Sequence, residues 1–214
     1  MRHYKTRGMS EMMNEGKLKI LQAAREVIVD QGIQGTTLRA VAERAGVSTG
    51  AIYHYYSSKE DILYDVMDEG LGEIKRIATV SLEDRKEAGD IIQEIYDGMQ
   101  ERFQKDAENR LQFYLAHEAM VGNEDIQQKF KEKYENWITR VEAIFVRAYG
   151  VEKGPSTRAV ATWTMAGIDG MVLQTLLQTG TIDQAQTNRV LHYLLTEGFP
   201  HFFELIHSRD AVNE

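Results

Sequence analysis

Apolar residues recur every three or four positions along almost the whole chain, which is the period of an amphipathic α-helix. The first stripe is Ile20, Leu21, Ala24, Val27 and Ile28, and Gly32 follows it where a left-handed helix end is expected. Further helices are predicted over residues 37–45, 48–55, 57–79, 86–105, 107–121, 124–149, 156–180 and 184–206. No useful stretch alternates with the period of a strand. The pattern predicts an all-α fold of about nine helices.

The breaks between these helices suggest two domains after a flexible N-terminal arm over residues 1–14. Residues 15–75 form a predicted three-helix DNA-binding domain together with the start of a connecting helix, which opens at a Ser57–Glu60 capping box. Residues 76–214 form a predicted helical bundle. Pro200 lies inside the last helix and cannot donate a backbone hydrogen bond, so we expect that helix to kink or restart there.

The most informative stretch is TLRAVAERAGVSTGAIYHYY, residues 37–56. Thr36 or Thr37 can cap one short helix and Ser48 the next, and Ala45–Ser48 forms a short turn containing glycine, as in a helix-turn-helix. If Val47 and Ile52 face inward, the second helix turns its other side outward. Its outward residues are Thr49, Gly50, Tyr53 and His54, which could enter a major groove.

Charge is distributed unevenly along the chain, whose net charge is -8. Residues 1–60 contain nine Lys or Arg and six Asp or Glu, whereas residues 61–214 contain sixteen and twenty-seven. A basic head on an acidic body suits a protein that presents one end to DNA phosphates. Chance asymmetry is the alternative explanation.

The stretch resembles the TetR/AcrR-type regulators. The shared residues are Thr37, Ala45-Gly46-Val47-Ser48, Ile52-Tyr53, Tyr56, Lys59-Glu60 and Ile62-Leu63. Two positions depart from the family pattern, because Tyr55 replaces a frequent His and Tyr56 a frequent Phe. The resemblance implies a homodimer that binds a palindromic operator and is released, as a repressor, when a small molecule binds the C-terminal domain.

The resemblance also implies roles for single residues. Thr37, Tyr53, Tyr55 and Lys59 would bind phosphates, while Ser48, Thr49, Gly50 and His54 would face bases. Arg39 could reach a guanine edge or a phosphate. Tyr53 and Tyr56 could instead be ordinary core aromatics, and His54 a plain exposed residue.

A ligand pocket is expected among the aromatic and methionine residues of the C-terminal helices. The candidates are Tyr96, Met99, Phe103, Phe113, His117, Glu118, Trp137 and Trp163. His117 and Glu118 are the predicted polar anchors, and a buried Glu118 would favour a cationic or donor-rich ligand. For any one of the aromatics and methionines, a plain core position is the alternative.

Residues 159–182 carry a single charge, Asp169, yet their Thr and Gln content argues against a membrane span. Small residues there would let a partner helix approach closely, so we expect a dimer interface at Ala166, Gly167, Gly170 and Leu177. A central core helix of a monomer is the alternative.

Little in the sequence indicates catalysis. There is no cysteine, and the six histidines include no His-x-x-x-His pair. Nucleophile-elbow and phosphate-loop motifs are also absent. We therefore expect no enzyme activity, metal or cofactor. The first sixteen residues lack the apolar stretch of a secretory signal, so a cytoplasmic location is expected. An enzyme and an architectural DNA binder without a ligand are the competing classes.

Overall fold

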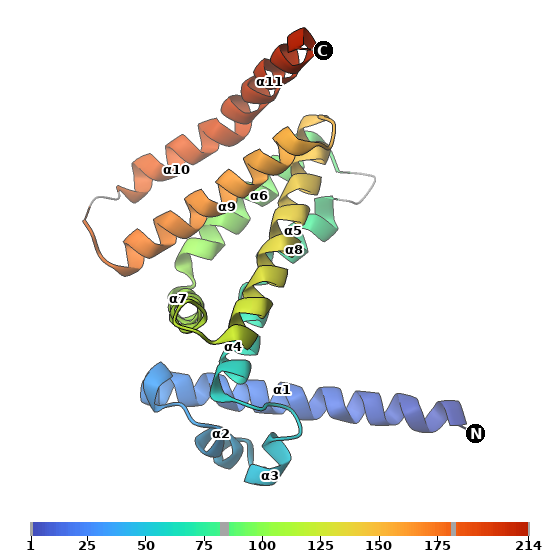
Figure 1. The fold of residues 1–214 in the computed structure, drawn as a ribbon, viewed down its shortest axis with the longest axis vertical. Coiled ribbons are helices and arrows are strands. Elements are labelled where there is room, and N and C mark those ends of the chain that lie inside the picture. Colours follow the sequence, from blue (N-terminus) through green and yellow to red (C-terminus); the bar gives the residue numbers. More distant parts are fainter. Residues whose placement is uncertain (1, 82–85, 181–182, 214) are drawn as a thin grey trace. The chain divides into compact units, whose positions relative to one another are not determined.

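The computed structural model describes residues 2–81, 86–180 and 183–213, and these contain helices and turns but no strand. The chain divides into two compact units (Figure 1). One comprises residues 1–70 and 111–127, and the other comprises residues 71–110 and 128–214. The all-α prediction is confirmed. The predicted boundary at residue 75 differs, because the chain leaves the first unit after Gly70 and residues 111–127 belong to that same unit.

The first unit is built around α1 (Arg2–Gly35), which packs on α2 (Leu38–Ala45) and α4 (Lys59–Gly70). The short helix α3 (Thr49–Ile52) packs on α2. Ile20, Ala24 and Val27 of α1 are buried, as the apolar stripe predicted. Gly32 has φ 72°, so the helical path is interrupted where the sequence indicated.

Two helices differ in extent from the sequence expectation. Residues 2–14 of the predicted flexible arm are helical, since α1 begins at Arg2. The predicted helix over residues 57–79 is divided into α4 and α5 (Glu73–Ser81). Gly70 and Gly72 flank the division, and glycine is a poor helix former.

The second unit contains α5, α6 (Ala88–Gln104), α9 (Pro155–Leu176) and most of α8 (Glu124–Tyr149). It ends with α10 (Gln184–Tyr193), a π-helical turn at Leu194–Gly198 and α11 (Phe199–Asn213). These last three elements follow one line in space (Figure 1). The restart at Phe199 confirms the effect expected of Pro200, whose missing N–H breaks the regular ladder. Helix α7 (Asp106–Met120) begins in this unit and continues in the first.

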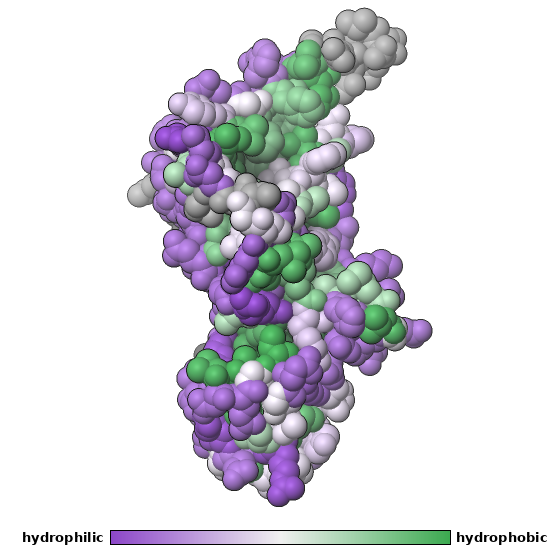
Figure 2. All heavy atoms as spheres, turned by 90° about the vertical axis from the view of Figure 1, so that its left-hand side faces the viewer, coloured by the Kyte–Doolittle hydropathy of each residue, from purple (hydrophilic) through white to green (hydrophobic). Residues whose placement is uncertain are grey.

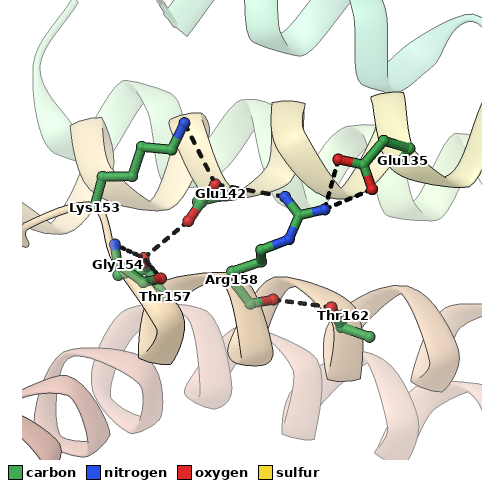
Figure 3. A network of polar contacts seen from close by, with 7 residues as sticks. All are labelled: Glu135, Glu142, Lys153, Gly154, Thr157, Arg158 and Thr162. Atoms are coloured by element: carbon green, nitrogen blue, oxygen red, sulfur yellow. Dashed lines mark hydrogen bonds and ion pairs between the residues drawn. The ribbon is translucent and has the colours of Figure 1, made fainter.

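A buried carboxylate joins α8 to the start of α9 (Figure 3). The side chain of Glu142 is 2% exposed, and its Oε1 accepts a hydrogen bond of 3.2 Å from the Thr157 hydroxyl. Its Oε2 lies 3.7 Å from Lys153 Nζ and 3.9 Å from an Arg158 nitrogen. Two cations thus balance one buried carboxylate, as a charge in a protein interior requires.

The described part of the chain contains no helix that is both long enough and apolar enough to cross a membrane. This agrees with the sequence argument about residues 159–182, although residues 181 and 182 themselves lie outside the described residues.

Candidate DNA-binding surface and ligand cavity

Local backbone chemistry positions the helix-turn-helix. Thr37 Oγ1 accepts a hydrogen bond of 3.1 Å from the Ala40 N–H, and Ser48 Oγ accepts one of 3.1 Å from the Ala51 N–H. Each side chain therefore caps its helix as predicted. Gly46 ends α2 with φ 63°, ψ 35°, a left-handed conformation that glycine adopts without strain. The turn between the two helices is fixed at both ends.

The helix after the turn presents small and polar residues to solvent. Ser48, Thr49, Gly50 and His54 are exposed, and the Tyr53 side chain is 59% exposed. Burial of Ile52 on the opposite side holds α3 against the unit core. Small exposed residues at a helix start allow close approach to phosphates and base edges.

Tyr53 and Tyr56 differ clearly in their exposure to solvent. Tyr56 is only 4% exposed, and its hydroxyl donates a 3.1 Å hydrogen bond to Asp65. Burial, together with the nearby Asp65 carboxylate, raises the pKa of Tyr56. Tyr56 is therefore a core aromatic, whereas the exposed Tyr53 side chain is available for contact with DNA.

The other predicted phosphate contacts come from the start of α2, the residues after α3 and the start of α4. Thr37 and Arg39 are exposed, and within the described part of the chain Arg39 forms no ion pair. Lys59 Nζ lies 5.5 Å from the centroid of the Tyr114 ring. Tyr55 is half-buried beside Gly16 of α1, where an added Cβ would lie 2.6 Å from the tyrosine hydroxyl.

The capping box that opens α4 is shifted by one residue from the prediction. Ser58 Oγ accepts a 3.1 Å hydrogen bond from the Asp61 N–H, and Asp61 Oδ2 accepts one of 3.2 Å from the Ser58 N–H. Adjacent Ser-Ser and Glu-Asp pairs allow either register, so sequence spacing alone could not choose between them.

The second unit encloses a mainly apolar cavity of about 60 Å³. Its walls include Ile95, Met99, Val141, Phe145, Met165 and Ile168, and one charged side chain, Arg102, lines it with them. Arg102 comes from the last turn of α6. The cavity is far smaller than the roughly 300–1,000 Å³ typical of small-molecule sites, so a larger ligand requires its walls to separate.

The structure brings together only some of the predicted ligand residues. Met99 and Trp137 line the cavity, whereas Trp163 is 79% exposed and lines a surface groove that shares Met99, Thr164 and Ile168 with the cavity. Tyr96 and Phe103 are half-buried but belong to neither lining. The remaining three, Phe113, His117 and Glu118, lie in the unit that carries the helix-turn-helix, and His117 is exposed.

Arg102 is the feature that the sequence prediction missed. It continues the apolar stripe of α6 that contains Ile91, Ile95 and Met99. A cation at such a position is easily interpreted as solvent-facing, yet its side chain is only 9% exposed. The signal was its helical spacing, because Arg102 falls three residues after Met99 on the buried face.

An apolar groove of about 530 Å³ lies between α9 and the line of α10 and α11. Trp163, Gly167 and Met171 line one side, and Leu194 and Phe202 line the other. Figure 2 shows that apolar side chains gather in a hollow on this unit. Of the predicted interface residues, Ala166 and Gly167 are exposed, Gly170 is half-buried, and Leu177 is 65% exposed.

Comparison with known proteins matches both units to one group. The profile of the bacterial regulatory proteins of the tetR family covers residues 20–66, and that of the BetI-type transcriptional repressor C-terminal region covers residues 90–200. The chain belongs to the TetR family. It is thus a DNA-binding transcriptional regulator, and the family assignment made from residues 37–63 is confirmed.

Relatives of this TetR-family chain include a regulator of fatty acid metabolism and a transcriptional repressor. The fatty acid metabolism regulator protein of Bacillus subtilis is 27% identical over 177 residues, covering 82% of this chain and 84% of the relative. The repressor KstR2 of Rhodococcus jostii is 23% identical over 133 residues, covering 59% of this chain and 64% of the relative.

Solved structures share the fold of this TetR-family chain. FadR of Bacillus subtilis in complex with stearoyl-CoA has a TM-score of 0.59 and 22% identity, over 85% of this chain and 98% of that chain. A regulator from Saccharomonospora viridis in complex with choline has a TM-score of 0.63 and 17% identity, over 86% and 97%.

Proposed function

We propose that this chain is a homodimeric repressor that leaves its operator when an acyl ligand, as a free acid or a thioester, enters the cavity of the second unit. The observation that carries the proposal is the pairing of an exposed recognition helix in one unit with an apolar, arginine-bearing cavity in the other. Similar proteins support the acyl class, since one is a fatty acid metabolism regulator and another was solved in complex with stearoyl-CoA.

Choline is the competing ligand because of the regulator crystallised with it. A quaternary ammonium is recognised by aromatic faces and by negative charge. The cavity offers Trp137 and Phe145, but its charged group is the Arg102 cation. Charge therefore favours an anionic or strongly accepting head group over a cation.

Operator binding is tested by fluorescence anisotropy with DNA from the region upstream of the chain's own gene. Lys59→Ala should weaken binding to all sequences and reduce the slope of log Kd against log salt by about one, because one phosphate contact is lost. His54→Ala should change the preference among operator variants instead. Lys131→Ala, an exposed lysine of α8 in the second unit, is the matched control. An unchanged salt slope for Lys59→Ala would contradict its proposed role.

The dimer is proposed to form through the apolar surface of α9, α10 and α11. Trp163 and Leu177 are 79% and 65% exposed, which is unusual for large apolar side chains unless a partner covers them. Trp163→Arg should give monomers in sedimentation analysis. It should also lose operator affinity, because two helix-turn-helix units are needed to bind half-sites roughly 34 Å apart. Val29→Arg, at an equally exposed valine of α1, should leave the dimer intact. A dimeric Trp163→Arg protein would refute this interface.

A further inference from the structure

Three helices of the second unit meet at a buried charged cluster beside the cavity. Arg102 of α6 places its Nη2 atom 3.8 Å from Asp169 Oδ1 of α9. The Tyr134 hydroxyl of α8 donates a 2.5 Å hydrogen bond to Asp169 Oδ2. The Arg102 and Asp169 side chains are 9% and 16% exposed. The cluster therefore connects the cavity wall to the helix that carries the proposed dimer surface.

The Arg102–Asp169 contact is longer than a charge-assisted hydrogen bond, which spans about 2.7–2.9 Å. A guanidinium stays charged in proteins and binds carboxylate or phosphate oxygens through parallel N–H groups. A ligand oxygen that reached hydrogen-bonding distance would therefore interact with Arg102 more strongly than Asp169 does at 3.8 Å. A ligand oxygen can therefore replace the Asp169 carboxylate as the partner of Arg102.

We propose that Arg102 binds the anionic or acyl-carbonyl head of the ligand. This contact weakens the ion pair between Arg102 and Asp169, and so weakens the attachment of α9 to α6. The inference rests on the proposed function and assigns two residues within it. Arg102 selects the head group, and Asp169 is a positioning residue that transmits occupancy to α9.

The position of Arg102 in the chain extends its effect beyond α9. The Asn109 side-chain amide donates a 3.1 Å hydrogen bond to the Arg102 carbonyl, so Arg102 is tied to the junction where α6 ends and α7 begins. Helix α7 then continues into the unit that contains the helix-turn-helix. A shift at Arg102 thus acts on a segment that leads to the DNA-binding unit.

The test compares dodecanoate with dodecan-1-ol, which share an apolar chain and differ in head charge. Calorimetry gives ligand affinity without DNA, and anisotropy gives the factor by which each ligand weakens operator binding. For the wild-type protein we expect dodecanoate to bind at least about tenfold more tightly than the alcohol, since hydrogen bonds to a buried charge are strong. In Arg102→Gln this preference should disappear, whereas Arg76→Gln, at a surface ion pair of α5, should retain it.

Asp169→Asn separates binding from transmission. We expect it to bind dodecanoate as tightly as the wild type or more so, because the competing carboxylate is gone, yet to show a smaller ligand effect on operator affinity. The double variant R102Q/D169N removes both charges together, avoids an uncompensated buried carboxylate, and should also lose the preference for dodecanoate.

Two results would overturn the inference while leaving the proposed function standing. One is a preference for dodecanoate that survives in R102Q and in R102Q/D169N. The other is an undiminished ligand effect on operator affinity in Asp169→Asn. If operator binding by the wild-type protein responds neither to these two lipids nor to dodecanoyl-CoA, the proposed acyl response fails, and the inference fails with it.

Discussion

Replacing Gly46 with alanine should destabilise the helix-turn-helix through backbone conformation alone. Gly46 has φ 63°, a region that costs other L-residues about 1–2 kcal/mol. An added Cβ would contact nothing closer than Lys19 Nζ at 4.0 Å, so no steric clash adds to this cost. A loss of about 1–2 kcal/mol corresponds to a roughly 5- to 30-fold rise in the population of the locally open state.

Hydrogen exchange by mass spectrometry measures this effect where it occurs. Both tryptophans, Trp137 and Trp163, lie in the second unit, so their fluorescence reports on the wrong part of the molecule. Peptides covering residues 38–56 contain the Val47 N–H, which donates a 3.0 Å hydrogen bond to the Ala42 carbonyl. Their protection should fall about 5- to 30-fold in Gly46→Ala if they open locally. Gly46→Asn should lose less protection from hydrogen exchange, because asparagine tolerates the left-handed region.

Gly50→Ala is the matched control four residues away. Its added Cβ would have Ser48 Oγ, at 3.9 Å, as its nearest neighbour, and its φ lies outside the left-handed region. Protection should therefore stay constant or rise, because alanine favours a helix more than glycine does. Operator affinity should fall, since the new methyl stands on the proposed base-facing surface. Unchanged protection in Gly46→Ala, or reduced protection in Gly50→Ala, would refute the reasoning.

Other changes test the second unit. In Gly98→Ala the new Cβ would overlap the Cδ1 atom of Ile77, so that flexible side chain must move. Both residues line the cavity, so calorimetric affinity for dodecanoate should fall while Tm changes little. Burial raises the pKa of Tyr149, so above about pH 10 the unfolded chain loses a proton that the folded chain keeps. Urea-unfolding free energy should therefore fall as pH rises past that point, and less steeply in Tyr149→Phe. Replacing both Lys153 and Arg158 with Gln leaves the buried Glu142 carboxylate uncompensated. This double change should lower Tm more than Glu142→Gln does, because Glu142→Gln leaves two cations that are partly exposed to solvent. Equal losses of Tm would contradict this asymmetry.

The helix-turn-helix could be predicted from sequence because its determinants are local. Thr37 and Ser48 bond to backbone atoms three residues away, and Gly46 acts through its own φ. Such interactions depend on neighbouring residues and on little else, so residue type and spacing suffice to identify them. The base and phosphate contacts proposed for this surface stay predictions, because they depend on DNA.

The ligand cavity could not be predicted in the same way, since it depends on which helix faces meet. Phe113 and His117 share the helical period and chemistry of cavity residues, yet they belong to the other unit. Arg102 has the chemistry of a surface residue and lines the cavity. Periodicity identifies a buried face but does not say what lies opposite it.

The small size of the cavity itself favours a switch over a passive binding site. A cavity of about 60 Å³ is far smaller than the roughly 300–1,000 Å³ typical of small-molecule sites. If the proposed acyl ligand enters this cavity, the lining helices α6, α8 and α9 must separate to admit it, and its binding free energy then favours the open state over the closed one. To reverse a 99:1 preference, the ligand must bind the open state about 10⁴-fold more tightly. Exclusion from the closed cavity provides such a difference by sterics, and the head-group contact proposed for Arg102 adds to it only if that contact is stronger in the open state.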